Sequence, residues 1–305
     1  MASFAINDTR RNSSSDPALR SLLQKAVRRG YVSTVRDTVA RLAEMGDSAW
    51  LRSRAAVIAF EECWPAMGMV SLNGQHDPLM MLLAVTQSVK QKDAAGLGSL
   101  AYAYSEGDAS ASTGAPDSRA VRIVSAAYAR PVEFFDWAQR RCESPEQTAV
   151  VEMARKNLSL ASWPWDKSCI LAGAYLAITS GVPRVKKAEI IGDSEFPYWV
   201  AIDKHTPQGK AAMRKVATNS GLPVMQVQWA SFYFESALTN ALEPSAWWET
   251  EQVWRLHQIG LTASTAEAIW ADVAGEVQRA VTQGTEALRN TIAHGGPIAQ
   301  TTLLA

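Results

Sequence analysis

Residues 203–210 hold the densest group of side chains that could do chemistry. Asp203, Lys204, His205 and Lys210 lie close together here, and Asp203 or Thr206 can cap the helix that follows. Amide groups at a helix start attract anions, so the two lysines and the histidine predict a phosphate-binding site. A simple helix cap with solvated lysines is the main alternative. General-base chemistry by His205 beside Asp203 is another, but no nucleophile is evident in the sequence.

Charge is distributed unevenly along a chain whose formal net charge is zero. Residues 1–54 contain ten Lys and Arg against five Asp and Glu, a local balance of +5. Residues 235–290 contain three arginines against eight acidic residues, a balance of −5. The basic end is expected to contact phosphate and the acidic end to contact a protein, although ordinary solvated helix faces would give the same pattern.

The candidate binding residues follow from this charge pattern. The cations expected to contact nucleic acid are Lys25, Arg28, Arg29, Arg36, Arg52, Arg54, Lys186, Lys187, Lys204, His205, Lys210 and Arg214. Phosphate contacts through such side chains are sequence-tolerant and strongly salt-dependent. In the acidic C-terminal part, the surrounding negative charge favours the core or a protein interface over base stacking. The candidate partner-binding residues there are Trp247, Trp248 and Trp254.

Helical periodicity runs through most of the chain and predicts an all-α fold. Three helices are expected within residues 16–63, with Asp16, Ser33 and Ser48 as their caps and with Gly30 and Gly46 ending the first two. No strand pattern with a period of two residues competes with this prediction. Further helices are expected at residues 78–90, 94–104, 118–130, 145–161, 166–180, 207–219, 245–259 and 264–290, with others beginning near 131 and 224.

Composition divides the chain into two helical regions and two ends. Residues 1–15 and 294–305 are expected to be flexible. Residues 16–180 are expected to form a multi-helix domain, with a mobile Gly- and Ser-rich loop at 106–118. Proline, glycine and charged residues interrupt any long helix at 181–198, so residues 181–293 are expected to form a second, smaller helical domain.

Several classes of protein are disfavoured by the sequence. No apolar run approaches the roughly 20 residues of a membrane span, so a cytoplasmic protein without membrane contact is expected. The three cysteines, Cys63, Cys142 and Cys169, are far apart and are expected to be buried thiols. No nucleotide loop, metal motif or catalytic triad is present, so we expect no cofactor and no metal, and we favour a non-catalytic protein.

The stretch ARLAEMGDSAWLRSRAAVIAFEEC, residues 40–63, resembles the C-terminal helical region of clamp-loader-like ATPases. The replication-associated recombination ATPases have a similar helix, a glycine and acidic turn, and an arginine-bearing apolar helix that ends in acidic residues. The likeness covers residues 18–105. It implies an oligomerisation collar of the kind that in this family is attached to an ATP-binding motor and works at stalled replication forks or in clamp handling.

The chain departs from that family in lacking a Gly-x-x-x-x-Gly-Lys-Ser/Thr phosphate loop and an acidic magnesium-binding strand. ATP hydrolysis therefore does not carry over. The resemblance implies a detached collar-like module, an accessory protein of DNA replication or recombination that touches DNA through basic faces. Its expected partners are DNA, a replication or recombination protein, or further copies of the chain. The alternative is a phage-type adaptor or inhibitor that acts through the acidic, Trp-rich part without binding DNA.

Overall fold

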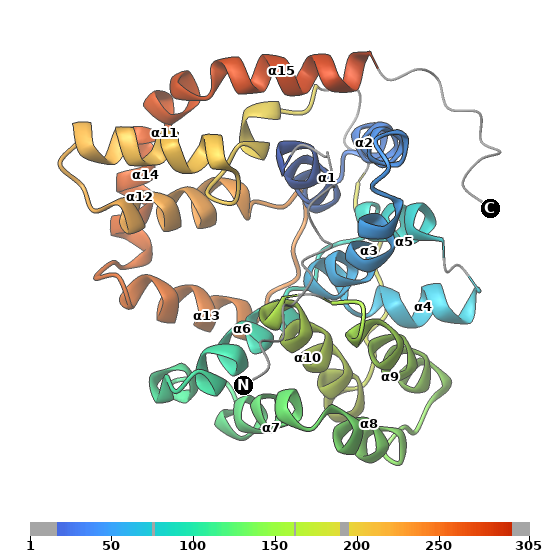
Figure 1. Ribbon diagram of the computed structural model, residues 1–305. Helices are drawn as coiled ribbons and strands as arrows, with labels where there is room; N and C mark the ends of the chain where they lie inside the picture. Colours follow the sequence, from blue (N-terminus) through green and yellow to red (C-terminus); the bar gives the residue numbers. More distant parts are fainter. Residues whose placement is uncertain (1–16, 75–76, 162, 190–194, 295–305) are drawn as a thin grey trace, which may run out of the picture.

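A computed structural model describes residues 17–74, 77–161, 163–189 and 195–294 (Figure 1). These residues form fifteen α-helices and no strand, so the predicted all-α fold is confirmed. In order, the helices are α1 (Pro17–Arg29), α2 (Val32–Glu44), α3 (Ser48–Cys63), α4 (Ala66–Leu72), α5 (Pro78–Thr86), α6 (Asp93–Ser105), α7 (Ser118–Ala129), α8 (Pro131–Gln139), α9 (Pro145–Leu158), α10 (Pro164–Ser180), α11 (Pro207–Asn219), α12 (Val224–Ser231), α13 (Ala246–His257), α14 (Ala263–Ala280) and α15 (Thr282–Ala293).

The described residues also form three short helical turns. Two are 3-10 turns, η1 (Ala109–Ser112) and η2 (Tyr198–Ala201), and one is a π-helical turn, η3 (Phe232–Ser236), which continues α12. The predicted flexible N-terminus, residues 1–15, the predicted cap Asp16 and all but His294 of the predicted flexible tail, residues 294–305, lie outside the described residues. None of the helices in the described ranges combines the length and apolar character needed to cross a bilayer.

Local signals set many of the helix ends. Gly30 and Gly46 end α1 and α2 with φ angles of +81° and +83°, a conformation that costs glycine little. Ser144 begins α9 through a capping box in which its hydroxyl accepts from the Gln147 amide. These are the positions at which the sequence predicts boundaries.

Two differences between predicted and observed helices have a clear cause in packing, whereas others, such as the end of α9 at Leu158 instead of residue 161, are shifts of a few residues. The helix expected at 264–290 is two helices, because the chain turns at Val281, which is buried between α14 and α15. The helix expected at 78–90 ends at Thr86. After it, the backbone of Ser88 and Lys90 is extended and forms isolated bridges to Lys187 and Leu242. Packing between distant segments thus ends both helices earlier than their local pattern indicates.

The loop at 106–118 joins α6 to α7, and its mobility stays a prediction. It contains the turn η1, in which Ala111 is buried. Trp254 Nε1 donates a hydrogen bond to Ser110 Oγ at 3.0 Å. One buried alanine and one long-range hydrogen bond therefore connect this loop to the rest of the chain.

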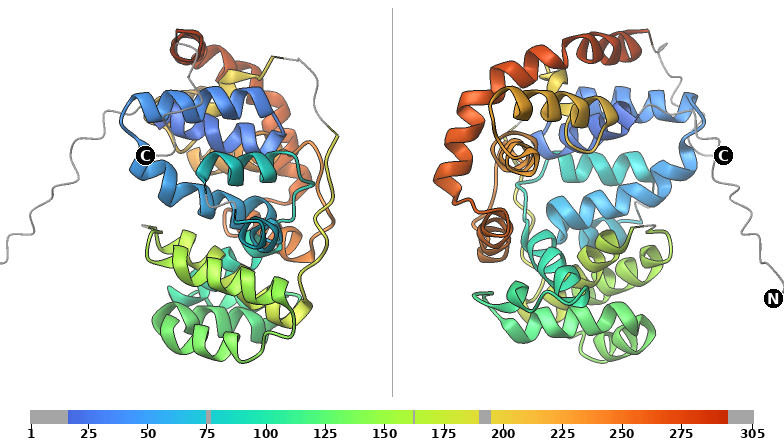
Figure 2. Two further views of the ribbon diagram at one scale, coloured as in Figure 1. Left: turned by 90° about the vertical axis from the view of Figure 1, so that its right-hand side faces the viewer. Right: turned by 60° about the vertical axis from the view of Figure 1, so that its left-hand side comes forward.

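The helices enclose two hydrophobic clusters. The first is formed by α1–α10, and the second by α11–α14 (Figure 1). Residues 196–202 and Leu288 of α15 join the first cluster although they follow the predicted boundary at 181–198. In the further views, α15 lies at one end of the molecule and α7 and α8 at the other (Figure 2). The division into two domains stays a prediction.

Candidate functional site

The predicted contacts Lys25 and Arg28 lie inside the protein. Their side chains are 3% and 2% exposed, because α2, α5 and η2 pack around α1. Both form ion pairs with carboxylates from distant parts of the chain. The prediction that they contact nucleic acid is therefore wrong, since neither cation can reach a phosphate without leaving its buried partner.

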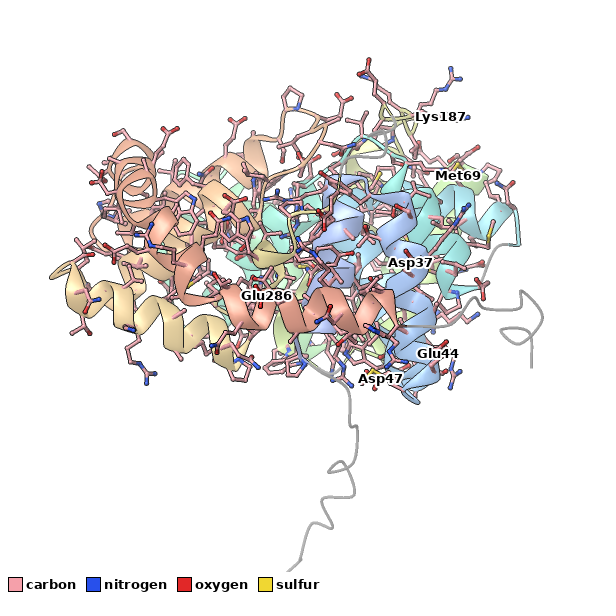
Figure 3. All side chains as sticks on the ribbon, turned by 90° about the horizontal axis from the view of Figure 1, so that it is seen from above. Asp37, Glu44, Asp47, Met69, Lys187 and Glu286 are labelled. Carbon is pink, nitrogen blue, oxygen red and sulfur yellow. The ribbon has the colours of Figure 1, made fainter. Side chains whose placement is uncertain are left out.

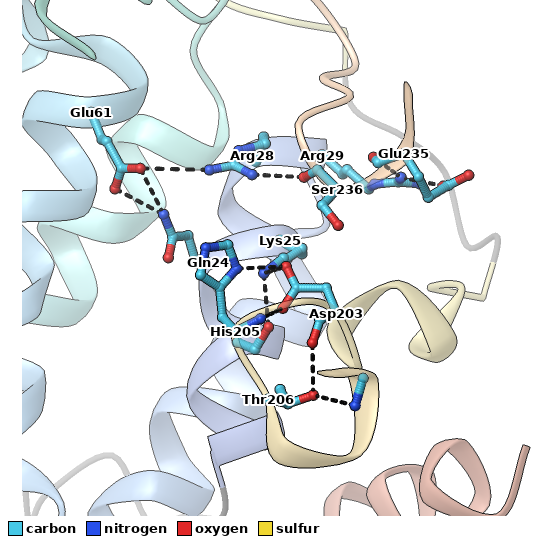
Figure 4. Close-up of polar contacts among 12 residues, drawn as sticks. Gln24, Lys25, Arg28, Arg29, Glu61, Asp203, His205, Thr206, Glu235 and Ser236 are labelled. Carbon is cyan, nitrogen blue, oxygen red and sulfur yellow. Dashed lines mark hydrogen bonds and ion pairs between the residues drawn. The ribbon is translucent and has the colours of Figure 1, made fainter. Parts of the chain in front are cut away.

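Arg28 is paired with the two adjacent acids that end α3. Its Nη2 lies 2.7 Å from Glu62 Oε1. The same Nη2 lies 3.7 Å from Glu61 Oε1, and Nη1 donates to the Ser236 carbonyl at 2.6 Å (Figure 4). Lys92, also buried, lies 2.8 Å from Glu62 Oε2. Burial alone would raise the pKa of Glu62, but Arg28 and Lys92 lower it to about 2. Burial raises the pKa of Glu61 despite its cationic neighbours.

Lys25 joins α1 to the segment before α11. Its Nζ lies 2.6 Å from Asp203 Oδ2, and His205 Nδ1 lies 2.9 Å from the same oxygen (Figure 4). Burial opposes ionisation of Asp203, but Lys25 and His205 hold its pKa well below the usual range. We call the six residues of these two groups the α1 ion-pair network, which comprises Lys25, Arg28, Glu61, Glu62, Lys92 and Asp203.

Two further predicted contacts, Arg29 and Arg54, have carboxylate partners at the edges of this network. Arg29 Nη2 lies 2.6 Å from Glu235 Oε1, and Arg54 Nη1 lies 2.5 Å from Asp166 Oδ2. Both side chains are less than one-fifth exposed. They connect helices and are not available to phosphate in this arrangement.

The turn from Asp203 to Gly209 starts α11 as the sequence predicts. Thr206 is the cap: its Oγ1 accepts from the Gly209 amide at 3.0 Å and donates to the Asp203 carbonyl at 3.0 Å. A Cβ at position 209 would collide with that carbonyl oxygen, so glycine permits the close approach. The Asp203 carboxylate points away from the cap, toward Lys25 (Figure 4). The turn that the sequence predicts to bind an anion is thus held against α1 by the ion pair between Asp203 and Lys25.

Lys204 faces aromatic rings in this turn. Its Nζ lies 3.1 Å from the centre of the Trp229 ring and 4.6 Å from that of Phe232. The Arg255 guanidinium also lies over Trp229, at 4.9 Å. Burial lowers the pKa of Lys204 to about 7, and the positive charge of Arg255 acts in the same direction. Lys204 therefore has internal partners, while the neighbouring His205 side chain is 55% exposed.

The three tryptophans that the sequence predicts to bind a partner pack against other parts of the chain. Trp254 is 8% exposed, so the prediction that it forms a partner surface is wrong. Trp248 lies under the Lys92 ammonium, with 4.9 Å from Nζ to the ring centre, and its ring lies 5.9 Å from that of Tyr233. Trp247 packs against the first hydrophobic cluster. Trp247 and Trp248 are half-buried and contact other parts of the chain.

The remaining predicted cations are exposed but do not form one patch. Arg36 lies on α2 and Arg52 on α3, while Lys186 forms an ion pair with Glu243 at 2.9 Å. Lys187 projects from the edge opposite to α15 and far from α11 (Figure 3). The basic residues at 184–187 therefore do not extend the positive surface at 203–214.

Helix α11 carries the largest group of free cations among the predicted residues. Lys210 and Arg214 are exposed on its outer side, and Lys215, which is not among the predicted candidates, is exposed beside them. The helix contains no acidic residue. Within the described ranges, none of the three forms an ion pair with a carboxylate. We call Lys210, Arg214 and Lys215 the α11 basic face.

The cysteines and the possible metal ligands of the described residues form no further site. Cys63 and Cys169 are buried as predicted, and Cys142 is half-buried. In the described part of the chain, no cluster of three His, Cys, Asp or Glu side chains could hold a metal ion. Among known proteins, no family model, no curated protein and no solved structure matches this chain.

Proposed function

We propose that the protein is a non-catalytic accessory protein of DNA replication or recombination that contacts DNA phosphates through the α11 basic face. The observation that supports this most is the absence of acidic residues from α11 combined with three exposed cations, Lys210, Arg214 and Lys215. Free lysine and arginine side chains on one helix bind phosphate without reading sequence.

The rigid base of α11 also supports the proposal. The helix begins at a turn that is fixed by Thr206 and held on α1 through Asp203 and Lys25. A positive face on such a base needs little reorganisation on binding, which lowers the entropic cost of association. The process is proposed from the resemblance of residues 40–63 to the collar of clamp-loader-like ATPases. In this proposal α1–α3 serve assembly, and α11 serves DNA contact.

The test is fluorescence anisotropy of labelled single-stranded, duplex and forked DNA between about 50 and 200 mM salt. The variant replaces the α11 basic face with Lys210→Ala, Arg214→Ala and Lys215→Ala. Affinity is expected to fall for every DNA form, and the slope of log affinity against log salt is expected to decrease by about 2 to 3.

A matched control removes the same charge elsewhere. Arg122, Arg140 and Lys156 are exposed at α7, after α8 and on α9. The control Arg122→Ala, Arg140→Ala, Lys156→Ala is expected to bind DNA with nearly unchanged affinity. Absence of binding to every DNA form at the lowest salt would sink the proposal, as would equal losses in the two variants.

A further inference from the structure

A cavity of about 430 Å³ lies between α7, α8 and α10. Helices α7 and α8 lie at the end of the molecule away from α15 (Figure 1). The volume of the cavity falls in the range of about 300 to 1,000 Å³ that is typical of small-molecule sites. The side chains that line it combine aromatic rings with charges of both signs: Asp117, Arg119, Ile123, Trp137, Arg141 and Tyr175.

The aromatic wall is formed by Trp137 and Tyr175. Their ring centres are 6.4 Å apart and their planes are within 19° of parallel. Phe134 packs on Trp137 from within α8, with 5.6 Å between ring centres, which fixes the indole in place. Tyr175 is buried, whereas Trp137 is half-buried and reaches the cavity. Flat, preorganised aromatic surfaces of this kind favour a planar ring in the ligand.

Two arginines give the cavity a net positive charge. Arg119 and Arg141 are exposed, and the guanidinium carbon of Arg141 lies 5.1 Å from the Trp137 ring centre. Within the described residues, neither forms an ion pair with a carboxylate. Planar guanidinium groups bind phosphate oxygens in pairs and can stack on a base, so this arrangement suits a phosphorylated ligand with an aromatic ring.

Asp117 adds a hydrogen-bond acceptor. One of its oxygens, Oδ1, accepts from the Arg119 amide at 2.8 Å and caps α7. In the described residues no donor occupies the other oxygen, which leaves it for a ligand. A carboxylate beside two arginines disfavours a simple anion and favours a ligand that also carries N–H donors.

We propose that this cavity binds a nucleotide, either free or as an unpaired unit of a single strand. The phosphate contacts Arg119 and Arg141, the base lies against the wall formed by Trp137, and an exocyclic amino group of the base donates to Asp117. Adenine, guanine and cytosine nucleotides therefore bind more tightly than uracil nucleotides. The site is separate from the α11 basic face and stands independently of the function proposed above.

Isothermal titration calorimetry of the full chain with AMP, GMP, CMP and UMP tests the proposal, with a short single-stranded oligonucleotide as a second arm. Saturable binding is expected, and Arg119→Ala and Arg141→Ala are each expected to weaken it about tenfold or more. Trp137→Leu is expected to weaken it at least about fivefold. Arg122→Ala, an exposed arginine on α7 outside the cavity lining, is the matched control and is expected to bind normally.

A conservative variant separates recognition from folding. Asp117→Asn keeps a good helix cap, so α7 is expected to stay folded while the preference for amino-bearing bases over UMP disappears. Binding of mononucleotides alone identifies a free nucleotide as the ligand, and tighter binding of the oligonucleotide identifies a strand. The triple variant of α11 must leave mononucleotide binding unchanged. Absence of binding to all mononucleotides and to the oligonucleotide, or normal binding by both arginine variants, would overturn the proposal.

Discussion

Helices α1 and α11 are both basic, but the cations of α1 form ion pairs inside the protein and those of α11 face solvent. Each contains several cations and no acidic residue within its bounds. On α1 every cation is paired with a carboxylate from another segment: Arg20 with Asp47, Lys25 with Asp203, Arg28 with Glu62 and Arg29 with Glu235. On α11 the three cations are exposed and have no such partner in the described residues. Whether the cations of a basic helix form internal ion pairs or face solvent therefore depends on carboxylates elsewhere in the chain.

The largest expected effect comes from removing one cation of the α1 ion-pair network. Arg28→Ala leaves Glu62 and Glu61 buried with less compensating charge, and we expect the free energy of unfolding to fall by about 3 to 5 kcal/mol. Urea unfolding measures the change. Arg36→Ala, which removes an exposed arginine from α2, is the control and is expected to change stability by less than about 0.5 kcal/mol. Similar values for the two variants would mean that the comparison between buried and exposed cations fails.

Acid should weaken the same network. Interactions with cations lower the pKa of Glu62 to about 2 and place that of Asp203 below its usual range. Unfolded Glu and Asp titrate near about 4.3 and 3.9, so the stabilisation is complete above these values and is lost as pH falls toward 2. Glu61, whose pKa is raised, opposes part of this loss. We expect a decrease on the order of 3 kcal/mol, measured by urea unfolding from about pH 6 to pH 2.

The Asp203→Asn variant provides the comparison for the acid experiment. It lacks one of the two carboxylates with a lowered pKa, so its stability should depend less on pH in this window. A pH dependence identical to that of the unmodified chain would show that Asp203 contributes nothing to it.

A smaller effect is expected from the coupling between Lys25 and Asp203. Lys25→Met and Asp203→Asn each leave a buried polar group without its partner, whereas the double variant removes both charges together. The double-mutant cycle should give a coupling energy of about 1 to 3 kcal/mol. Additive losses in the cycle would show that the 2.6 Å contact does not stabilise the fold.

The smallest effect is expected at α11. Replacing Lys210, Arg214 and Lys215 by alanine removes no ion pair of the described residues, and alanine favours a helix. Stability should therefore change by no more than about 0.5 kcal/mol per position in urea unfolding. A loss as large as that for Arg28→Ala would show that α11, like α1, uses its cations to hold the fold.

Much of the fold can be predicted from local sequence because the helix signals are local. Gly30, Gly46 and the Ser144 cap mark helix ends by backbone conformation and short-range hydrogen bonds. The turn at Val281 has no such signal, since it contains neither glycine nor proline and Val281 is buried in the first hydrophobic cluster. Short helices such as α4 are missed for a similar reason.

The candidate site is less predictable because its partners are remote in sequence. Arg28 and Glu62 are 34 residues apart, and Arg28 and Ser236 are 208 residues apart. Periodicity places Lys25 and Arg28 on the polar side of α1 but does not show that this side is covered. One signal was available: Glu61 and Glu62 interrupt the apolar run AAVIAFEEC, and acidic residues in such a run need buried cations.

Arg28 contacts a residue that is synthesised long after it. Helix α1 is synthesised before the Ser236 carbonyl to which Arg28 donates, and this carbonyl follows Arg28 by 208 residues. At about 5 to 20 residues per second, the delay is roughly 10 to 40 s. During this interval Arg28 lacks the Ser236 carbonyl, and Lys25 lacks its partner until Asp203 has been synthesised. The α1 ion-pair network is thus complete only after residue 203 has been synthesised, and a chain interrupted before that residue would leave the Lys25 ammonium without its carboxylate partner.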